Sequence, residues 1–149
     1  PTPPPTPPPP FFFLMILRPP RSTTKPSSAA SVVYKRQPFN DNGLISGKVG
    51  LDLTLDEGKD AAKDCGKMIL AQAQKACGNL SKIQRCIKLG GFVNCEPNFT
   101  DQALVIEGAS ELMIDIFEDY GWHSRYAVGS NSLPLGMAVE IDAIFEIKT

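Results

Sequence analysis

The sequence is poor in the residues that bind metals. It holds one histidine, His123, and four cysteines, none of which forms a C-x-x-C pair. Zinc sites draw on close pairs of Cys and His, so the sequence predicts no metal site and no other cofactor. Cysteines without a metal pattern are typical of free thiols in a reducing compartment, and we therefore predict a cytoplasmic protein.

The sequence also lacks an excess of charge and a long apolar run. Its 15 basic and 16 acidic residues give a formal net charge of −1, without the basic surplus typical of proteins that bind nucleic acid. The apolar run "FFFLMIL" is far shorter than the ~20 residues of a membrane span. We expect neither a nucleic-acid partner nor a membrane partner.

Residues 1–37 differ in composition from the rest of the 149-residue chain. "PTPPPTPPPP" cannot form a helix or a central strand, and it would suit a disordered tail or an SH3-type ligand. A signal peptide is a poorer interpretation, because no basic residue precedes the apolar run. "FFFLMILRPPRS" and "SAASVVYKRQ" resemble translated sequencing-adapter DNA. We therefore predict that residues 1–37 are a non-native, disordered segment and that 38–149 form one domain.

From Phe39 onward the pattern predicts an α+β domain. Thr54 and Glu57 form a capping-box pattern ahead of a helix that Gly78 ends. In "SKIQRCIKLGGFVN", Ile83, Ile87 and Leu89 alternate as in a strand with one buried face. A second helix is expected between Thr100, as its cap, and Gly121. With both apolar stripes turned one way, the two helices are expected to cover one face of a sheet.

The last segment predicts two strands, at 125–129 and 137–148, joined through "NSLPLG". A regular antiparallel hairpin centred between Ser132 and Leu133 would place Arg125 opposite Glu140, with their Cβ atoms about 5 Å apart. Such a pair is either a surface salt bridge or a site in which Arg125 binds a carboxylate and Glu140 holds a water. Ala127, two residues from Arg125, would leave room for a small ligand. His123 is a conceivable base, although a packing role is more usual for a histidine beside a tryptophan.

Three stretches resemble the Rid family of imine deaminases, also called YjgF-like and formerly described as endoribonucleases. They are "GKVGLDLTLDEGKDAAK", "GFVNCEPNFTDQALVIEGASELMIDIF" and "SRYAVGSNSLPLGMAVEIDAIFEI". The resemblance runs from about Phe39 to the C-terminus. It implies a chorismate-mutase-like fold, with a mostly antiparallel sheet, two helices on one face and a homotrimer with clefts between subunits. Two strands precede the first helix in the family, and we expect this chain to lack them.

The resemblance also implies an activity and residues that perform it. Deaminating members hydrolyse small 2-imino acids to 2-oxo acids and ammonia without a cofactor. Arg125 matches the arginine that binds the substrate carboxylate, and Glu140 matches the glutamate that positions the attacking water. Many members carry cysteine where this chain has Ala127, which leaves the preferred substrate open. A non-catalytic trimer that binds a small carboxylate is the alternative function, and ribonuclease activity is the third.

Overall fold

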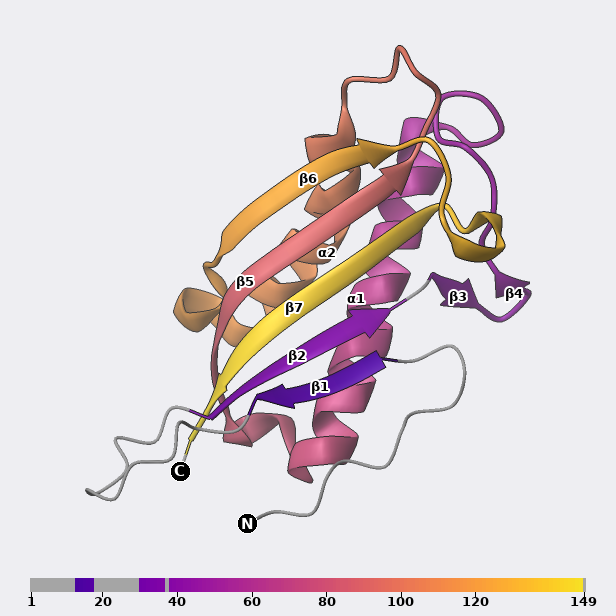
Figure 1. Cartoon of the computed structure of the whole chain (residues 1–149). Coiled ribbons are helices and arrows are strands. Elements are labelled where there is room, and N and C mark those ends of the chain that lie inside the picture. The colour runs from indigo at the N-terminus through magenta and orange to yellow at the C-terminus, as the bar shows by residue number, and fades with distance from the viewer. Residues whose placement is uncertain (1–12, 18–29, 37, 149) are drawn as a thin grey trace.

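Two long helices pack side by side against one face of a five-stranded sheet (Figure 1). The computed structural model describes residues 13–17, 30–36 and 38–148. The two helices and the mixed sheet confirm the predicted α+β class. The strands are β1 Phe13–Leu17, β2 Ala30–Arg36, β3 Phe39–Asn40, β4 Gly43–Leu44, β5 Ile83–Asn94, β6 Ser124–Ser130 and β7 Val139–Ile147. The helices are α1 Leu55–Cys77 and α2 Gln102–Phe117, with short 3-10 helices η1 Leu80–Lys82, η2 Glu118–Gly121 and η3 Pro134–Gly136.

The first helix begins and ends where its local signals predict. The Thr54 hydroxyl accepts from the Glu57 amide at 3.2 Å, and the Glu57 carboxylate accepts from the Thr54 amide at 2.7 Å. This reciprocal pair satisfies two amide groups at the helix start. At the other end Gly78 takes a φ of 83°, a conformation that favours glycine, and its amide donates to the Gln74 carbonyl.

The second helix is shorter than the sequence predicted. It begins after Asp101, not Thr100, and no side chain caps its first turn. It ends at Phe117 because Glu118 takes a φ of 52°, and η2 then carries the chain to Gly121. An added side chain at Gly121 would overlap the backbone of Met113, which explains why glycine stands there.

The long strand β5 departs from simple alternation. Register shifts occur between Ile83 and Arg85 and between Cys86 and Lys88. Each irregularity changes which residues face the helices. Cys86 is therefore buried and Ile87 is 36% exposed, so the expectation that Ile87 packs with Ile83 and Leu89 is wrong.

The strand order is β1-β2-β7-β5-β6, and this order contradicts the predicted hairpin. The strand β6 pairs in parallel with β5, and β7 pairs antiparallel with the opposite edge of β5. The last two strands therefore have β5 between them. The chain reaches β6 from β5 by the crossover helix α2, as parallel neighbours require. It then passes the end of β5, where the buried Asn94 side chain donates to the Met137 carbonyl at 3.1 Å.

Two strands of the five-stranded sheet, β1 and β2, precede α1, where we expected the family's N-terminal strands to be lacking. The backbone of β2 pairs antiparallel with β7, and β1 pairs with β2. A sheet edge accepts such segments because the ladder is built from backbone groups that every non-proline residue carries. We expected residues 1–37 to be disordered. The structure instead has strands at 13–17 and 30–36. The adapter origin of these residues, the rest of 1–37 and the boundary at residue 38 stay predictions.

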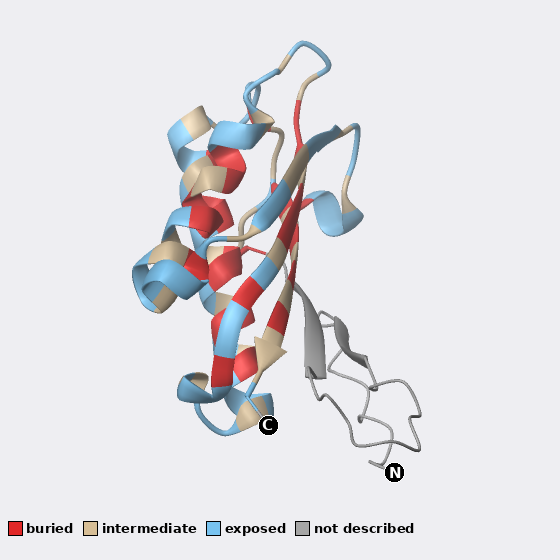
Figure 2. Cartoon of the chain, turned by 90° about the vertical axis from the view of Figure 1, so that its left-hand side faces the viewer, coloured by how far each residue is buried: buried red, intermediate tan, exposed pale blue. Residues whose placement is uncertain are grey.

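The core lies between the helices and the sheet, where the buried residues gather in Figure 2. Its largest fully buried side chains include Phe145, Ile69, Leu89, Ile106 and Met113. Along β7 the odd positions from Val139 to Phe145 are buried and the even positions are half-buried. The residues of β7 from Val139 to Phe145 therefore alternate between the helix-facing side and the open side of the sheet.

Candidate functional site

Arg125 lies on the helix-facing side of β6, at the edge of the sheet. It is directly opposite Leu89 of β5, which is fully buried under the helices. Its Nη1 donates to Glu107 Oε2 at 2.9 Å and to Ser110 Oγ at 3.1 Å, and both partners belong to α2. The side chain keeps 27% of its surface exposed. The parallel crossover explains this contact, because it lays α2 over β6.

Ser110 connects Arg125 to the single histidine. Ser110 Oγ lies 3.0 Å from His123 Nε2, and His123 Nδ1 lies 2.5 Å from the Gly121 carbonyl oxygen. A carbonyl only accepts, so Nδ1 carries a hydrogen in this arrangement. In the neutral ring Nε2 is then an acceptor, and the Ser110 hydroxyl donates to it. The result is a continuous chain of hydrogen bonds from Gly121 through His123 and Ser110 to Arg125.

These side chains border a hollow of about 390 Å³ between α2, η2 and β6. Its lining consists of Glu107, Ser110, Ile114, Trp122, His123 and Arg125. Trp122 is 69% exposed, and it adds an aromatic wall beside the charged groups. Among the described residues, the Arg125 side chain makes two hydrogen bonds, and both are made by Nη1. The Nε and Nη2 groups of Arg125 therefore have no acceptor among these residues. That edge of the guanidinium can hold both oxygens of a carboxylate.

Glu140 does not join this group. It lies opposite Phe92 of β5, whereas Arg125 lies opposite Leu89. Positions 89 and 92 are an odd number apart in a regular stretch, so their side chains point to opposite faces. The predicted neighbourhood of Arg125 and Glu140 is therefore wrong within one chain. The physical reason is that β5 separates their strands, whereas the expected pairing assumed a direct hairpin.

Ala127 shares the helix-facing side with Arg125 but packs against the hydrophobic core. It is not part of the lining of the Arg125 hollow. The prediction that Ala127 leaves room for a ligand beside Arg125 is therefore not supported by this geometry. Sequence reasoning instead missed Glu107 and Ser110, whose spacing of three places them on one face of α2. Nothing in their local pattern indicates Arg125 as a partner until β6 is known to run parallel to β5.

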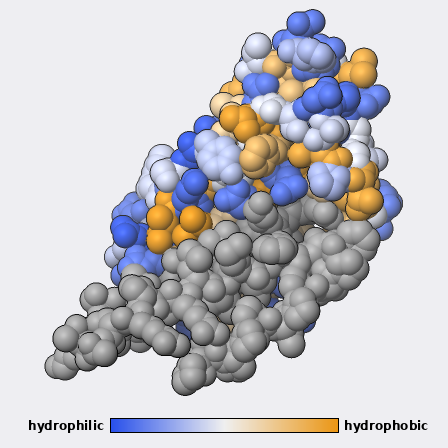
Figure 3. Space-filling model, in the orientation of Figure 1, coloured by the Kyte–Doolittle hydropathy of each residue, from blue (hydrophilic) through white to orange (hydrophobic). Residues whose placement is uncertain are grey.

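The open face carries a second polar group around Tyr126. Its hydroxyl donates to Asp142 Oδ1 at 2.7 Å, and Lys88 Nζ lies 4.9 Å from the centre of its ring. Burial and the hydrogen bond to Asp142 raise the pKa of Tyr126 to about 12, and Glu140 adds to the shift by repulsion. Figure 3 shows hydrophobic and hydrophilic side chains interspersed over the described part of this face. Glu140 therefore belongs to this group and not to the Arg125 hollow.

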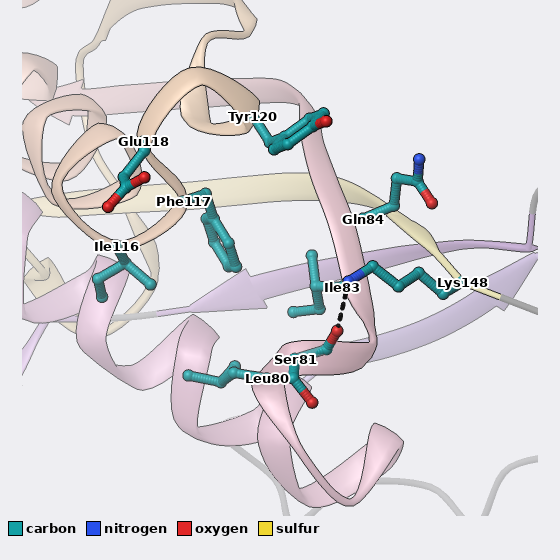
Figure 4. Close-up of a pocket in the computed structure, with 9 residues that line it drawn as sticks. All are labelled: Leu80, Ser81, Ile83, Gln84, Ile116, Phe117, Glu118, Tyr120 and Lys148. Atoms are coloured by element: carbon teal, nitrogen blue, oxygen red, sulfur yellow. Dashed lines mark hydrogen bonds between the residues drawn. The ribbon is translucent and has the colours of Figure 1, made fainter.

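A separate hollow of about 390 Å³ lies between η1, the start of β5 and the end of α2 (Figure 4). Phe117 and Ile83 form its apolar floor, and Tyr120 and Gln84 border it. Lys148 Nζ donates to the Ser81 carbonyl at 3.0 Å and is thereby held at the rim. This hollow lacks a cluster of polar groups held by one another, which distinguishes it from the Arg125 hollow.

Within the described ranges, no group of three or more His, Cys, Asp or Glu side chains is arranged to hold a metal ion. In the same residues, no helix has the length and apolar character needed to cross a bilayer.

A family model described as "YjgF/chorismate mutase-like, putative endoribonuclease" matches residues 30–146. The chain belongs to this family. The matched range includes β2 and both helices, and the observed fold confirms the resemblance in the sequence. The YjgF-like chain is 45% identical over 113 residues to Protein TCP17 of Trypanosoma cruzi, a match that covers 74% of this chain and 71% of that protein.

Solved structures of the YjgF-like fold agree with this assignment. The protein Atu1372 of Agrobacterium tumefaciens, of unknown function, superposes with a TM-score of 0.79 at 42% identity over 82% of this chain and 80% of that one. A protein of Shewanella oneidensis described as a "putative endoribonuclease" gives 0.76 at 28% identity, over 78% and 79% of the two chains. The relatives therefore share both the fold and a large part of the sequence.

Proposed function

We propose that this protein binds a small 2-imino acid through Arg125 and hydrolyses it to the 2-oxo acid and ammonia. The observation that carries the proposal is the guanidinium of Arg125, fixed at one nitrogen by Glu107 and Ser110 and open at its other edge. A ligand carboxylate on that edge makes two parallel charge-assisted hydrogen bonds without displacing Glu107. The bound acid then extends into the hollow beside Trp122.

The reaction requires little from the protein beyond holding the substrate and a water in the correct orientation. A protonated imine carbon is electrophilic, so a held substrate and a nearby water are the main needs. Water adds to the C=N carbon to give a carbinolamine, which then loses ammonia and leaves the 2-oxo acid. No metal ion or organic cofactor takes part in this proposal. A carboxylate beside the substrate would orient the water and accept its proton.

Two residues compete for the role of that carboxylate. Glu107 lies 2.9 Å from Arg125 in the same chain, and this geometry favours it. Glu140, which the Rid resemblance indicates, lies on the other face of its own sheet. It would serve an Arg125 ligand only in a cleft between subunits, as the homotrimer implied by the resemblance would provide. Light scattering after size-exclusion chromatography measures that assembly directly.

A coupled assay tests the proposal. A serine dehydratase generates 2-aminoacrylate, and lactate dehydrogenase reports the rate of pyruvate formation. We expect the protein to accelerate this step and Arg125→Ala to lower kcat/KM about a hundredfold, the effect of losing two charge-assisted hydrogen bonds. Arg125→Lys is the matched control, because it keeps the charge but loses the planar fork. Unchanged kcat/KM in both variants would refute the role of Arg125.

The variants Glu107→Gln and Glu140→Gln then identify the water-positioning residue. The geometry of one chain predicts that Glu107→Gln slows hydrolysis and Glu140→Gln leaves the rate nearly unchanged. The reverse result assigns the role to Glu140 and requires a site shared between subunits. Each change preserves side-chain volume, so loss of folding is a lesser concern than with alanine.

The same wild-type and variant proteins distinguish two other candidate activities. A binding protein for small carboxylates would bind pyruvate at Arg125 without turnover of the imine. Ribonuclease activity is suggested by the descriptions of the family and of the Shewanella protein. It predicts RNA cleavage that Arg125→Ala abolishes. The near-neutral net charge of −1 makes extensive phosphate binding a weaker expectation than binding of a single carboxylate.

A further inference from the structure

The lining of the Arg125 hollow is charged at one end and apolar at the other. Along α2 it passes from Glu107 to Ile114, and along the chain that enters β6 it passes from Arg125 back to Trp122. The crossover helix α2 runs in the opposite direction to β6, because it returns the chain to the start of a strand parallel to β5 (Figure 1). Both series therefore lead the same way, and Ile114 and Trp122 belong to the end of the hollow away from the ion pair.

Trp122 presents an open aromatic surface at this apolar end. Its side chain lies largely in solvent, at 69% exposure. Among the described residues, no other ring and no cation packs on the indole. Tryptophan offers a large rigid contact area, and it is enriched where proteins bind their partners. The indole is therefore free to pack against a ligand that Arg125 holds by its carboxylate.

The hollow is larger than the smallest 2-imino acids require. Its volume is about 390 Å³. Since water takes up about 30 Å³ per molecule in the liquid, this volume corresponds to about a dozen non-hydrogen atoms. On that scale 2-iminopropanoate fills about half of the hollow, and the same acid with a phenyl group on its methyl carbon fills about all of it. Volume and lining thus agree in favouring a bulky apolar side chain.

We propose that the Arg125 site takes 2-imino acids and 2-oxo acids with an aromatic side chain, and that Trp122 determines this specificity. The inference rests on the proposed binding of the carboxylate by Arg125. The carboxylate takes the open edge of the guanidinium, away from Glu107 and Ser110. The side chain of the ligand lies along the hollow against Ile114 and Trp122. Affinity then grows with the apolar surface that leaves water and with the contact between the two rings.

Stable 2-oxo acids test the inference without hydrolysis, because they keep the carboxylate and the side chain of the imine. Titration calorimetry with the full chain compares phenylpyruvate with pyruvate. We expect phenylpyruvate to bind about twentyfold tighter, since about half of the surface of its phenyl group leaves water. Equal affinities for the two acids would overturn the inference.

Variants of Trp122 identify the source of the preference. Trp122→Ala should lower the affinity for phenylpyruvate about tenfold and the affinity for pyruvate much less, whereas Trp122→Phe keeps an aromatic face and should keep most of the preference. Tyr120→Ala is the matched control, because Tyr120 is an aromatic residue at 61% exposure that borders the other hollow. It should retain the full preference. A preference that survives in Trp122→Ala, or that falls equally in Tyr120→Ala, refutes the role of Trp122.

A second copy of the chain is the alternative cover for the indole. Trp122 is the single tryptophan in the sequence, so tryptophan fluorescence reports on its surroundings alone. We expect the long-wavelength emission of an exposed indole without ligand, and a shift to shorter wavelength when 3-phenylpropanoate binds. Emission typical of a buried indole before any ligand is added would show that another subunit covers Trp122, and it would overturn the inference.

Failure of the proposed hydrolysis gives a different result. In that case the imine assay shows no acceleration, while the preference for phenylpyruvate persists and depends on Trp122, and the inference stands for a binding site. Conversely, hydrolysis of 2-aminoacrylate that Arg125→Ala abolishes, without a preference for phenylpyruvate, supports the proposed function and refutes the aromatic specificity. Phenylpyruvate binding that is unchanged in Arg125→Ala refutes both, because the acid is then not held by the guanidinium.

Discussion

Replacing Gly108 by alanine tests whether the close approach of the two helices determines the stability of the fold. A Cβ added at Gly108 would lie 2.1 Å from the backbone carbonyl oxygen of Lys59 in α1. A carbon–oxygen contact needs about 3.3 Å, so α1 and α2 would have to separate locally by about 1.2 Å. Backbone cannot rotate away as a side chain can. Gly108 lies between Glu107 and Ser110 on α2, so this separation would also displace the Arg125 partners.

The expected cost follows from two opposing effects. Overpacking costs up to about 3 kcal/mol, while replacing glycine by alanine inside a helix stabilises it by about 1 kcal/mol. The difference is a loss of about 2 kcal/mol in the free energy of unfolding. For a chain of this size the midpoint of thermal unfolding should fall by roughly 8 °C. Urea unfolding followed by circular dichroism measures the free energy directly.

Gly66→Ala is the matched control. Gly66 lies in the middle of α1, and an added Cβ would be 2.9 Å from Leu112 Cδ2, the end of a side chain that can rotate. The gain in helix propensity and the smaller strain should nearly cancel, leaving stability within about 1 kcal/mol of the wild type. A Gly108→Ala protein as stable as Gly66→Ala would refute the inferred helix contact.

Three further predictions concern single groups. Thr54→Ala removes one half of the capping box and should lower the free energy of unfolding by about 1 kcal/mol, measured in urea. The pKa of Tyr126 is raised from 10.0 to about 12, so its protonated form contributes stability below pH 10 that is lost as the pH rises through about 12. Tyr126→Phe, which lacks the bond to Asp142, should reduce that loss in alkaline unfolding experiments; an unchanged alkaline profile would contradict it. Burial raises the pKa of the Cys86 thiol to about 12, so an aromatic disulfide reagent at neutral pH should modify the half-exposed Cys77 first, and equal rates would disprove this.

The features that the sequence predicted correctly depend on neighbouring residues. The start of α1 at Thr54 and its end at Gly78 follow from hydrogen bonds made within one turn. The burial of alternate residues along β7 follows in the same way from the period of a strand. The sequence also predicted the family fold, because several stretches resemble it in the same order. These inferences needed no knowledge of which strands lie side by side.

The errors concern pairing between distant segments. We joined 125–129 to 137–148 as a hairpin, although the connection from Asn131 to Ala138 is longer than a tight turn needs. Its length instead allows the chain to pass the end of β5 and reach the strand beyond, two strand spacings or about 10 Å away. The predicted role of Arg125 as a carboxylate-binding residue stays a prediction, although Arg125 does line a hollow. Its partner was wrong, because the parallel pairing of β6 places it against Glu107 of α2 and not against Glu140.

The order of the strands also separates substitutions in the leading segment of the chain from substitutions at the Arg125 hollow. β1 and β2 form one margin of the sheet, while β6, which carries Arg125, forms the other, with β7 and β5 between them. Of the leading segment, the described strands 13–17 and 30–36 therefore lie at the margin of the sheet opposite the one that carries Arg125. Exchanging that leading segment should alter solubility and resistance to heat far more than the chemistry of the hollow, whose four polar side chains all come from a stretch of 19 consecutive residues, 107–125.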